Sequence, residues 1–205
     1  MGNCVSVEDI QAYNTAVLLP AQPPLMVIGA DFLATNEPVT TLYVLNNAYS
    51  WSDDFLTIKD RRTGVLVFQL KKGDGQHGFT KAVLDSTGQP VALVEATTRP
   101  GVHEVMRPGR TKLFTVKAIL TIFQSSLNCS VTDAATGQTH ALGIVGDWTE
   151  RRIVITCDGR PIAKVRNPDA ITNVEYYVDV APGVDMALIV LLVAALEAHD
   201  ETTPT

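Results

Sequence analysis

The amino-acid sequence predicts a mostly β protein, a closed antiparallel β-barrel that surrounds one hydrophobic helix near the C-terminus. The helix is indicated by residues 186–196, Met-Ala-Leu-Ile-Val-Leu-Leu-Val-Ala-Ala-Leu, which contain no polar side chain. A helix that is apolar on every side must be buried on every side. The barrel is indicated by many short segments between residues 25 and 181 that are rich in β-branched and aromatic residues. A closed sheet has no free edge strand, and the helix fills a lumen too wide for strand side chains alone.

The hydrophobic helix is too short to cross a lipid bilayer. Its eleven residues span roughly 16 Å at about 1.5 Å per residue, which is about half of a ~30 Å hydrocarbon core. Pro182 and Gly183 mark a break in the chain just before the helix. We therefore expect this helix to be buried in protein rather than in lipid.

Strands are expected throughout the region before the helix. Several form hairpins whose turns contain Asp and end with Gly, at residues 60–64, 85–88, 133–137 and 157–159. In such turns the Asp side chain bonds to nearby backbone and Gly takes the left-handed conformation. The lengths between hairpins vary too much for a solenoid repeat. In chain order, strands are expected at residues 25–30, 40–45, 55–59, 65–71, 80–84, 91–96, 113–117, 119–124, 128–132, 139–145, 152–156, 161–166 and 175–180.

The composition is that of an ordinary globular protein. A chain of 205 residues with 46% hydrophobic residues can form one domain with a substantial core. The net charge of −6 is a poor match for non-specific nucleic-acid binding, so no nucleic-acid partner is expected. Cys4, Cys129 and Cys157 have no C-x-x-C spacing and indicate a reduced, cytosolic protein. The glycosylation sequon at Asn128 would need a secretory route, for which the N-terminus shows no signal.

The N-terminus carries two candidate lipid-attachment residues. The first six residues, Met-Gly-Asn-Cys-Val-Ser, fit the pattern for myristoylation of Gly2, and Cys4 is positioned for palmitoylation. One myristoyl chain binds bilayers with a constant of only about 10⁴ M⁻¹, so stable attachment needs a second signal. No Lys or Arg occurs before Lys59, which excludes an adjacent polybasic segment. We expect acylation of both Gly2 and Cys4; the alternative is a chance match beside an idle thiol.

Three regions follow from these patterns. Residues 1–24 are expected to form the acylation motif and a flexible tether, since three prolines interrupt the last five of them. Residues 25–200 are expected to form the barrel domain, and residues 201–205 a short tail.

Several modest motifs occur in a fairly specific order and spacing. They are Phe55-Leu-Thr-Ile-Lys-Asp60, Gly78, Val83-Leu-Asp-Ser-Thr-Gly-Gln-Pro90, Phe114-Thr-Val-Lys117, Gly146-Asp-Trp-Thr-Glu-Arg151 and Val184-Asp185. In these motifs, and over about residues 32–200, the chain resembles the LURP-one-related family, whose fold is like that of the tubby C-terminal domain and the phospholipid scramblases. The resemblance implies a barrel of twelve strands around a C-terminal helix. It implies no settled activity and no shared catalytic residues, and relatives are associated with membranes, phosphoinositides, defence signalling or lipid scrambling.

Four motif residues, Gly146, Trp148, Arg151 and Asp185, are expected to be structural. Trp148 and Arg151 would form a corner in which the indole packs inward and the guanidinium bonds backbone carbonyls; the alternative is a recognition surface. Asp185 would complement the N-terminus of the helix. Scramblase-like relatives carry acidic residues linked to calcium here, but Asp179 and Asp185 lack the alternating oxygen ligands of a calcium loop.

No catalytic residue, cofactor or metal is expected. The four histidines have neither i, i+4 spacing nor cysteine partners, which gives a zinc site little support. Cys129 and Cys157 are expected to be buried inert thiols, with a catalytic Cys–His pair as the open alternative. No glycine-rich loop leads from a strand into a helix, as phosphate-binding motifs require. The histidines are His77, His103, His140 and His199.

The one local excess of basic residues lies between residues 99 and 117, where Glu104 is the only acid. Pro-Gly pairs bound loops in this stretch, so several cations could be presented together. On a membrane-tethered barrel each cation near an anionic surface contributes about 1 kcal/mol. The alternative is an ordinary solvated face. The candidate headgroup-binding residues are Arg99, Arg107, Arg110, Lys112 and Lys117.

These observations support one hypothesis of function and two alternatives. The hypothesis is a monomeric, non-enzymatic adaptor that acyl chains hold at the cytoplasmic face of the plasma membrane or an endomembrane, where it binds anionic phospholipids such as phosphoinositides in signalling. Lipid scrambling would need a membrane path, which a short buried helix does not give. A membrane-released transcriptional regulator, like that proposed for tubby proteins, is disfavoured by the acidic charge and by the lack of a nuclear-localisation run.

Overall fold

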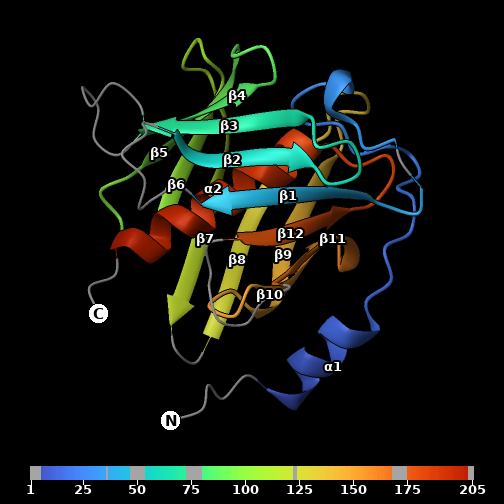
Figure 1. Ribbon diagram of the computed structural model, residues 1–205. Helices are drawn as coiled ribbons and strands as arrows, with labels where there is room; N and C mark the ends of the chain where they lie inside the picture. The colour runs from blue at the N-terminus through green and yellow to red at the C-terminus, as the bar shows by residue number, and fades with distance from the viewer. Residues whose placement is uncertain are drawn as a thin grey trace.

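The computed structural model describes residues 6–35, 37–46, 54–72, 80–121, 124–167 and 175–202. Within these ranges twelve strands form one closed barrel, and helix α2 (Met186–Thr202) runs through its centre (Figure 1). Helix α1 (Val7–Thr15) lies outside the barrel. The predicted fold class is therefore confirmed. The strands are β1 (Thr40–Asn46), β2 (Asp54–Asp60), β3 (Leu66–Lys72), β4 (Thr80–Asp85), β5 (Pro90–Ala96), β6 (Val102–Met106), β7 (Lys112–Thr121), β8 (Gln124–Thr132), β9 (Thr139–Asp147), β10 (Arg152–Cys157), β11 (Arg160–Arg166) and β12 (Glu175–Val180).

Each strand pairs antiparallel with the next one in sequence, and β1 closes the barrel by pairing with β12. The connections therefore alternate between the two ends of the barrel. We call the end at which α2 begins the entry end, and the opposite end the exit end. The β6–β7, β8–β9 and β10–β11 turns lie at the entry end, whereas the β5–β6 and β9–β10 turns lie at the exit end.

The core forms because strand side chains alternate between lumen and solvent. In β1, for example, Leu42 and Val44 are buried, whereas the side chain of Tyr43 between them points outward and is partly exposed. The lumen is filled by α2, in which every residue from Ala187 to Leu196 is at most 3% exposed. Burying one such leucine contributes about 1.5–3 kcal/mol. The hydrophobic run is thus the centre of the core, as predicted.

The strand boundaries differ from the prediction in three places. Strand β6 was not among the expected strands, since Pro-Gly pairs stand on both sides of it, but β5 and β7 supply hydrogen-bonding partners for it. The strand expected at residues 119–124 is divided between the end of β7 and the start of β8. Residues 25–30 form no strand of the barrel; Leu25 makes an isolated bridge to Val184 instead.

The N-terminal segment closes the entry end of the barrel. Backbone N–H groups of Ala21, Leu25 and Ala34 donate to the carbonyl groups of residues 182, 183 and 184, at 2.8, 2.9 and 2.9 Å. Leu25 and Ala34 are buried in the core. Residues 21–34, which are far from α2 in sequence, therefore hold the backbone just before this helix in place.

Among the described helices, none combines the length and the apolar character that crossing a membrane requires.

Candidate functional site

The five predicted headgroup-binding residues lie on β7 and in the turns before and after β6, and the structure separates them into two groups. Arg107, Arg110 and Lys112 gather at the β6–β7 turn, at the entry end, and we call them the turn group. Arg99 lies in the β5–β6 turn and Lys117 lies opposite the first residue of β6, so these two form an exit group. Lys112 and Lys117 are five residues apart on one strand, which corresponds to roughly 17 Å at ~3.3 Å per residue.

Two carboxylates partly neutralise the turn group. Glu95 on β5 lies opposite Glu104 on β6, so both acids stand on the same stretch of wall. Arg110 Nη1 is 3.0 Å from Glu95 Oε1, and Lys112 Nζ is 3.1 Å from Glu104 Oε1. Such exposed ion pairs contribute about 0–1 kcal/mol, but they balance two of the three charges. The predicted cationic face is therefore weaker at the entry end than the sequence indicates.

The segment expected to be a flexible tether contains helix α1. Ser6 caps the N-terminus of the helix, and its Oγ accepts a hydrogen bond from the backbone N–H of Asp9 at 3.0 Å. It packs beside β9 and β10. Lys164 Nζ donates to the carbonyl oxygen of Tyr13 at 2.8 Å and lies 4.2 Å from the centre of the Tyr13 ring. Burial raises the pKa of the Tyr13 hydroxyl, and the nearby guanidinium of Arg152, at the exit end of β10, opposes this change.

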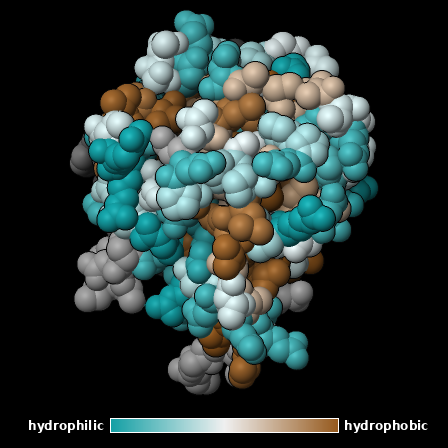
Figure 2. Space-filling view, turned by 90° about the vertical axis from the view of Figure 1, so that its right-hand side faces the viewer, coloured by the Kyte–Doolittle hydropathy of each residue, from teal (hydrophilic) through white to brown (hydrophobic). Residues whose placement is uncertain are grey.

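Apolar side chains are exposed on and just after α1. Of the six large hydrophobic side chains that are exposed among the described residues, four lie between residues 7 and 19. They are Val7, Ile10, Val17 and Leu19, which are 51–79% exposed. Figure 2 shows hydrophobic side chains along the centre and lower part of the face on which α1 lies. We call these four residues the apolar N-terminal surface; such clusters mark sites of interaction with proteins or membranes.

Gly2 and Cys4, the predicted acylation sites, lie outside the described residues. In sequence, Val7 at the start of α1 is only five residues after Gly2.

Gly146, Trp148 and Arg151 form a corner at the β9–β10 turn. Gly146 has φ +115°, and a Cβ there would overlap the carbonyl oxygen of Arg152, so no other residue fits. Arg151 Nη1 donates to the carbonyl oxygen of Trp148 at 2.9 Å, and its guanidinium lies 4.2 Å from the centre of the indole ring. Trp148 and Arg151 are 0% and 2% exposed. Both side chains therefore act inside the protein rather than on a recognition surface.

Arg151 also binds the central helix. Its Nη2 donates to Glu197 Oε2 at 3.0 Å, and the hydroxyl group of Tyr176 donates to Glu197 Oε1 at 2.9 Å. Burial raises the pKa of Tyr176 well above its ordinary value, so this hydroxyl remains a donor. Sequence reasoning missed both Tyr176 and Glu197. This buried cluster joins the wall of the barrel to the last turns of α2.

Asp185 joins the N-terminal segment to the start of α2. Its Oδ1 accepts from the N–H groups of Ala187 and Leu188, and its Oδ2 from those of residues 27, 28 and 29, at distances between 2.7 and 3.2 Å. Burial raises the pKa of Asp185, and these N–H groups act in the opposite direction. Both oxygens are occupied, and Asp179 binds Arg166 at 2.7 Å. This geometry supports the helix-capping role rather than calcium binding.

A groove of about 730 Å³ lies at the entry end, between residues 17–25 and the β8–β9 and β10–β11 turns. His140 and Cys157 both line this groove, a proximity that their spacing in the sequence did not predict. Burial raises the pKa of the Cys157 thiol to about 11, and that of Cys129 to about 12. Both thiols are therefore protonated near neutral pH, which does not favour a nucleophilic cysteine.

A model of the LURP-one-related family matches residues 40–197. The chain belongs to this family. The match begins at the first residue of β1 and ends at Glu197, so α1 and the apolar N-terminal surface precede it. The fold is also similar to the X-ray structure of a protein from Arabidopsis thaliana, with a TM-score of 0.62 and 22% identity over 85% of this chain and 98% of that chain. No curated protein matches the chain.

Proposed function

We propose that this LURP-one-related protein is a non-enzymatic adaptor that acyl chains on Gly2 and Cys4 hold at the cytoplasmic face of a membrane. There the barrel contacts anionic phospholipids and takes part in signalling. The observation that supports this proposal is the apolar N-terminal surface, which directly follows the acylation motif in sequence and precedes the part of the chain that matches the family.

The position of α1 indicates which end of the barrel faces the lipid. Because Tyr13 lies near Arg152, α1 with Val7 and Ile10 reaches toward the exit end, whereas Val17 and Leu19 line the groove at the entry end. The Debye length is about 8 Å at physiological ionic strength. The backbone of Lys112 in the turn group lies roughly two such lengths farther along the barrel than that of Lys117. In this orientation Arg99 and Lys117 face the anionic headgroups, and the turn group does not.

The anchor is tested by replacing Gly2 with Ala in a protein that carries a fluorescent tag at its C-terminus. A single palmitoyl site without myristate is not brought to the membrane, so the variant is expected in the cytosol. Cys4→Ser should leave weak, reversible association, because one myristoyl chain binds only marginally. Val5→Ala keeps both acceptor residues and serves as the control. Unchanged membrane retention of Gly2→Ala would disprove the proposed anchor.

A further inference from the structure

Among the described residues, one group of His, Cys, Asp or Glu side chains has the geometry of a metal-ligand set. It consists of His140, Cys157 and Asp158, each of which offers one ligand atom within 4.8 Å of the others. Two ligands of one tetrahedral zinc ion lie roughly 3.5 Å apart, since metal–ligand distances are about 2.0–2.3 Å. Candidate ligand atoms within 4.8 Å of one another are therefore close to the spacing that one ion requires.

The backbone holds these residues in place. Cys157 is the last residue of β10 and lies opposite Leu142 on β9. Asp158 and Gly159 both have positive φ, +49° and +79°, which is the conformation of a tight type I′ hairpin turn. The N–H group of Asp158 donates to the carbonyl oxygen of Ala141 at 2.8 Å, and the N–H group of Ala141 donates back to Asp158 Oδ1 at 2.9 Å. Two reciprocal hydrogen bonds between Asp158 and Ala141 thus hold the turn against β9.

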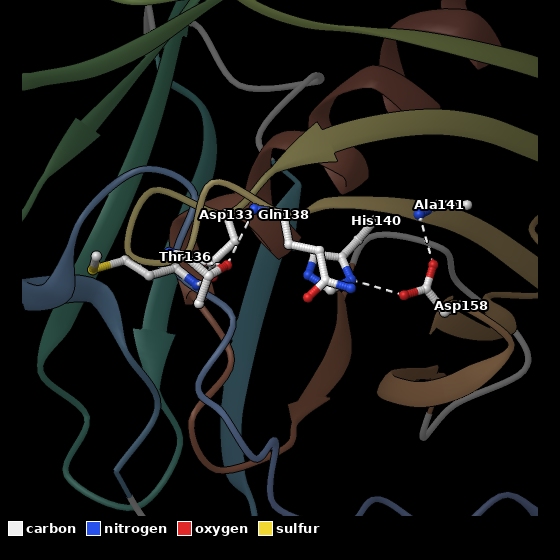
Figure 3. Close-up of polar contacts among 7 residues, drawn as sticks. Asp133, Thr136, Gln138, His140, Ala141 and Asp158 are labelled. Atoms are coloured by element: carbon white, nitrogen blue, oxygen red, sulfur yellow. Dashed lines mark hydrogen bonds and ion pairs between the residues drawn. The ribbon is translucent and has the colours of Figure 1, made fainter.

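The imidazole of His140 is oriented by Asp158. His140 Nδ1 lies 2.7 Å from Asp158 Oδ2 (Figure 3). An ionised carboxylate can only accept, so Nδ1 donates, and in a neutral imidazole Nε2 then carries the free lone pair. Carboxylate–histidine pairs of this kind orient the histidine ligands of metal sites and fix their tautomer. The pair leaves Nε2 of His140 as a candidate ligand atom, and the Sγ atom of Cys157 is a second candidate.

The donor set favours one class of metal. A sulfur and an imidazole nitrogen suit zinc and similar transition metals, whereas magnesium and calcium prefer oxygen ligands. His140, Cys157 and Asp158 all line the groove at the entry end, through which an ion and a water molecule can reach them. We propose that His140 and Cys157 bind a Zn²⁺ ion in this groove, with Asp158 orienting His140 and the two remaining tetrahedral positions facing the solvent.

The proposal is tested by titrating the reduced, metal-free full-length protein with Zn²⁺, and with Co²⁺, whose bond to a cysteine sulfur gives a charge-transfer absorption band. One equivalent of metal should bind, and the band should appear. His140→Gln and Cys157→Ser should each weaken Zn²⁺ binding at least tenfold and Cys157→Ser should abolish the band. Asp158→Asn should weaken binding about 10- to 100-fold, as expected for a residue that orients a ligand.

Two variants serve as matched controls. Cys4→Ser and His199→Gln remove the same functional groups elsewhere in the chain and should leave binding unchanged. Circular dichroism and thermal unfolding without metal establish that each variant is folded. The proposal is overturned if the wild-type protein binds no Zn²⁺, if Cys157→Ser and His140→Gln bind as well as the wild type, or if binding is lost with Cys4→Ser instead.

Discussion

At the scale of single residues, the cluster of Arg151, Glu197 and Tyr176 contains a buried ion pair. Arg151 and Glu197 are an ion pair at 3.0 Å in which both side chains are 3% exposed. Removing one partner of a buried pair leaves an uncompensated charge, which costs about 3–5 kcal/mol, whereas replacing both with apolar groups is often nearly neutral. Losing one partner of this pair is therefore expected to lower the stability by more than the intact pair contributes through its net attraction.

We predict that Arg151→Met lowers the free energy of unfolding by about 3–5 kcal/mol, because Glu197 keeps its charge inside the barrel. The double variant Arg151→Met/Glu197→Leu should be more stable than Arg151→Met. Urea denaturation measures both. Arg152→Met is the control, since this neighbouring arginine is 54% exposed and should change stability by about 0.5 kcal/mol or less. A double variant less stable than the single one would contradict the prediction.

Sequence reasoning anticipated one half of this cluster. Trp148 and Arg151 stand in a recognisable motif, and an arginine beside a tryptophan indicates a packed corner. Glu197 gave no signal, because it follows the apolar run immediately and looks like the first solvated residue after a buried helix. Glu197 is buried because the closed barrel brings Arg151, at the β9–β10 turn, and Tyr176, on β12, against it. No local sequence pattern indicates this arrangement.

At the scale of elements, the β8–β9 turn does more than reverse the chain. Asp133 Oδ1 accepts from the N–H groups of Ala135 and Thr136 within the turn, while its Oδ2 accepts from the N–H group of Met26 at 2.8 Å. The backbone N–H group of Ala134 also donates to the carbonyl oxygen of Met26 at 2.6 Å. One hairpin turn therefore holds the N-terminal segment that closes the entry end (Figure 3).

This contact predicts a pH-dependent contribution to stability. Burial acts to raise the pKa of Asp133, but the hydrogen bonds from Met26 and from the turn outweigh it and lower the pKa below its usual value. A lowered pKa in the folded state means that the stabilisation is present near neutral pH and is lost as the pH falls below about 4. Asp133→Asn should therefore cost about 1–3 kcal/mol at pH 7, and the difference from the wild type should shrink in acid.

Asp85→Asn is the matched control for this measurement. Asp85 accepts the same kind of bonds within its own turn, from the N–H groups of Thr87 and Gln89, but within the described part of the chain none from a distant segment. Denaturation curves at several pH values compare the two variants. If both lose equal stability at pH 7, the contact with Met26 contributes nothing.

The hairpins also show what could be predicted between elements. The Asp–Gly turns fixed most strand ends, because their chemistry is local. The pairing of His140 with Asp158 was missed, although counting back from the β9–β10 turn places Cys157 opposite Leu142 and therefore Asp158 beside Ala141. By contrast, counting the charged residues between 99 and 117 could not show that Glu95 on β5, outside this stretch, pairs with Arg110.

At the scale of the whole molecule, the two groups of cations lie toward opposite ends of the barrel and make the orientation on a membrane testable. With acylated protein, Arg99→Gln/Lys117→Gln should weaken binding to vesicles that contain phosphatidylserine by roughly 30-fold, at about 1 kcal/mol per cation. Arg107→Gln/Lys112→Gln should have a smaller effect, because that end lies farther from the lipid and Lys112 is paired with Glu104. Vesicle pelleting measures both. A larger effect of the second pair would reverse the proposed orientation.

The central helix comes after all twelve strands in the chain. During synthesis, every strand therefore leaves the ribosome before the residues that will fill the lumen, and β1 must wait for β12 before the ring can close. Until then the nascent polypeptide presents many unpaired edges and apolar faces, which are the features that lead to aggregation. Translation that stops before residue 186 should thus yield a product dependent on chaperones and prone to degradation, not a partly working barrel.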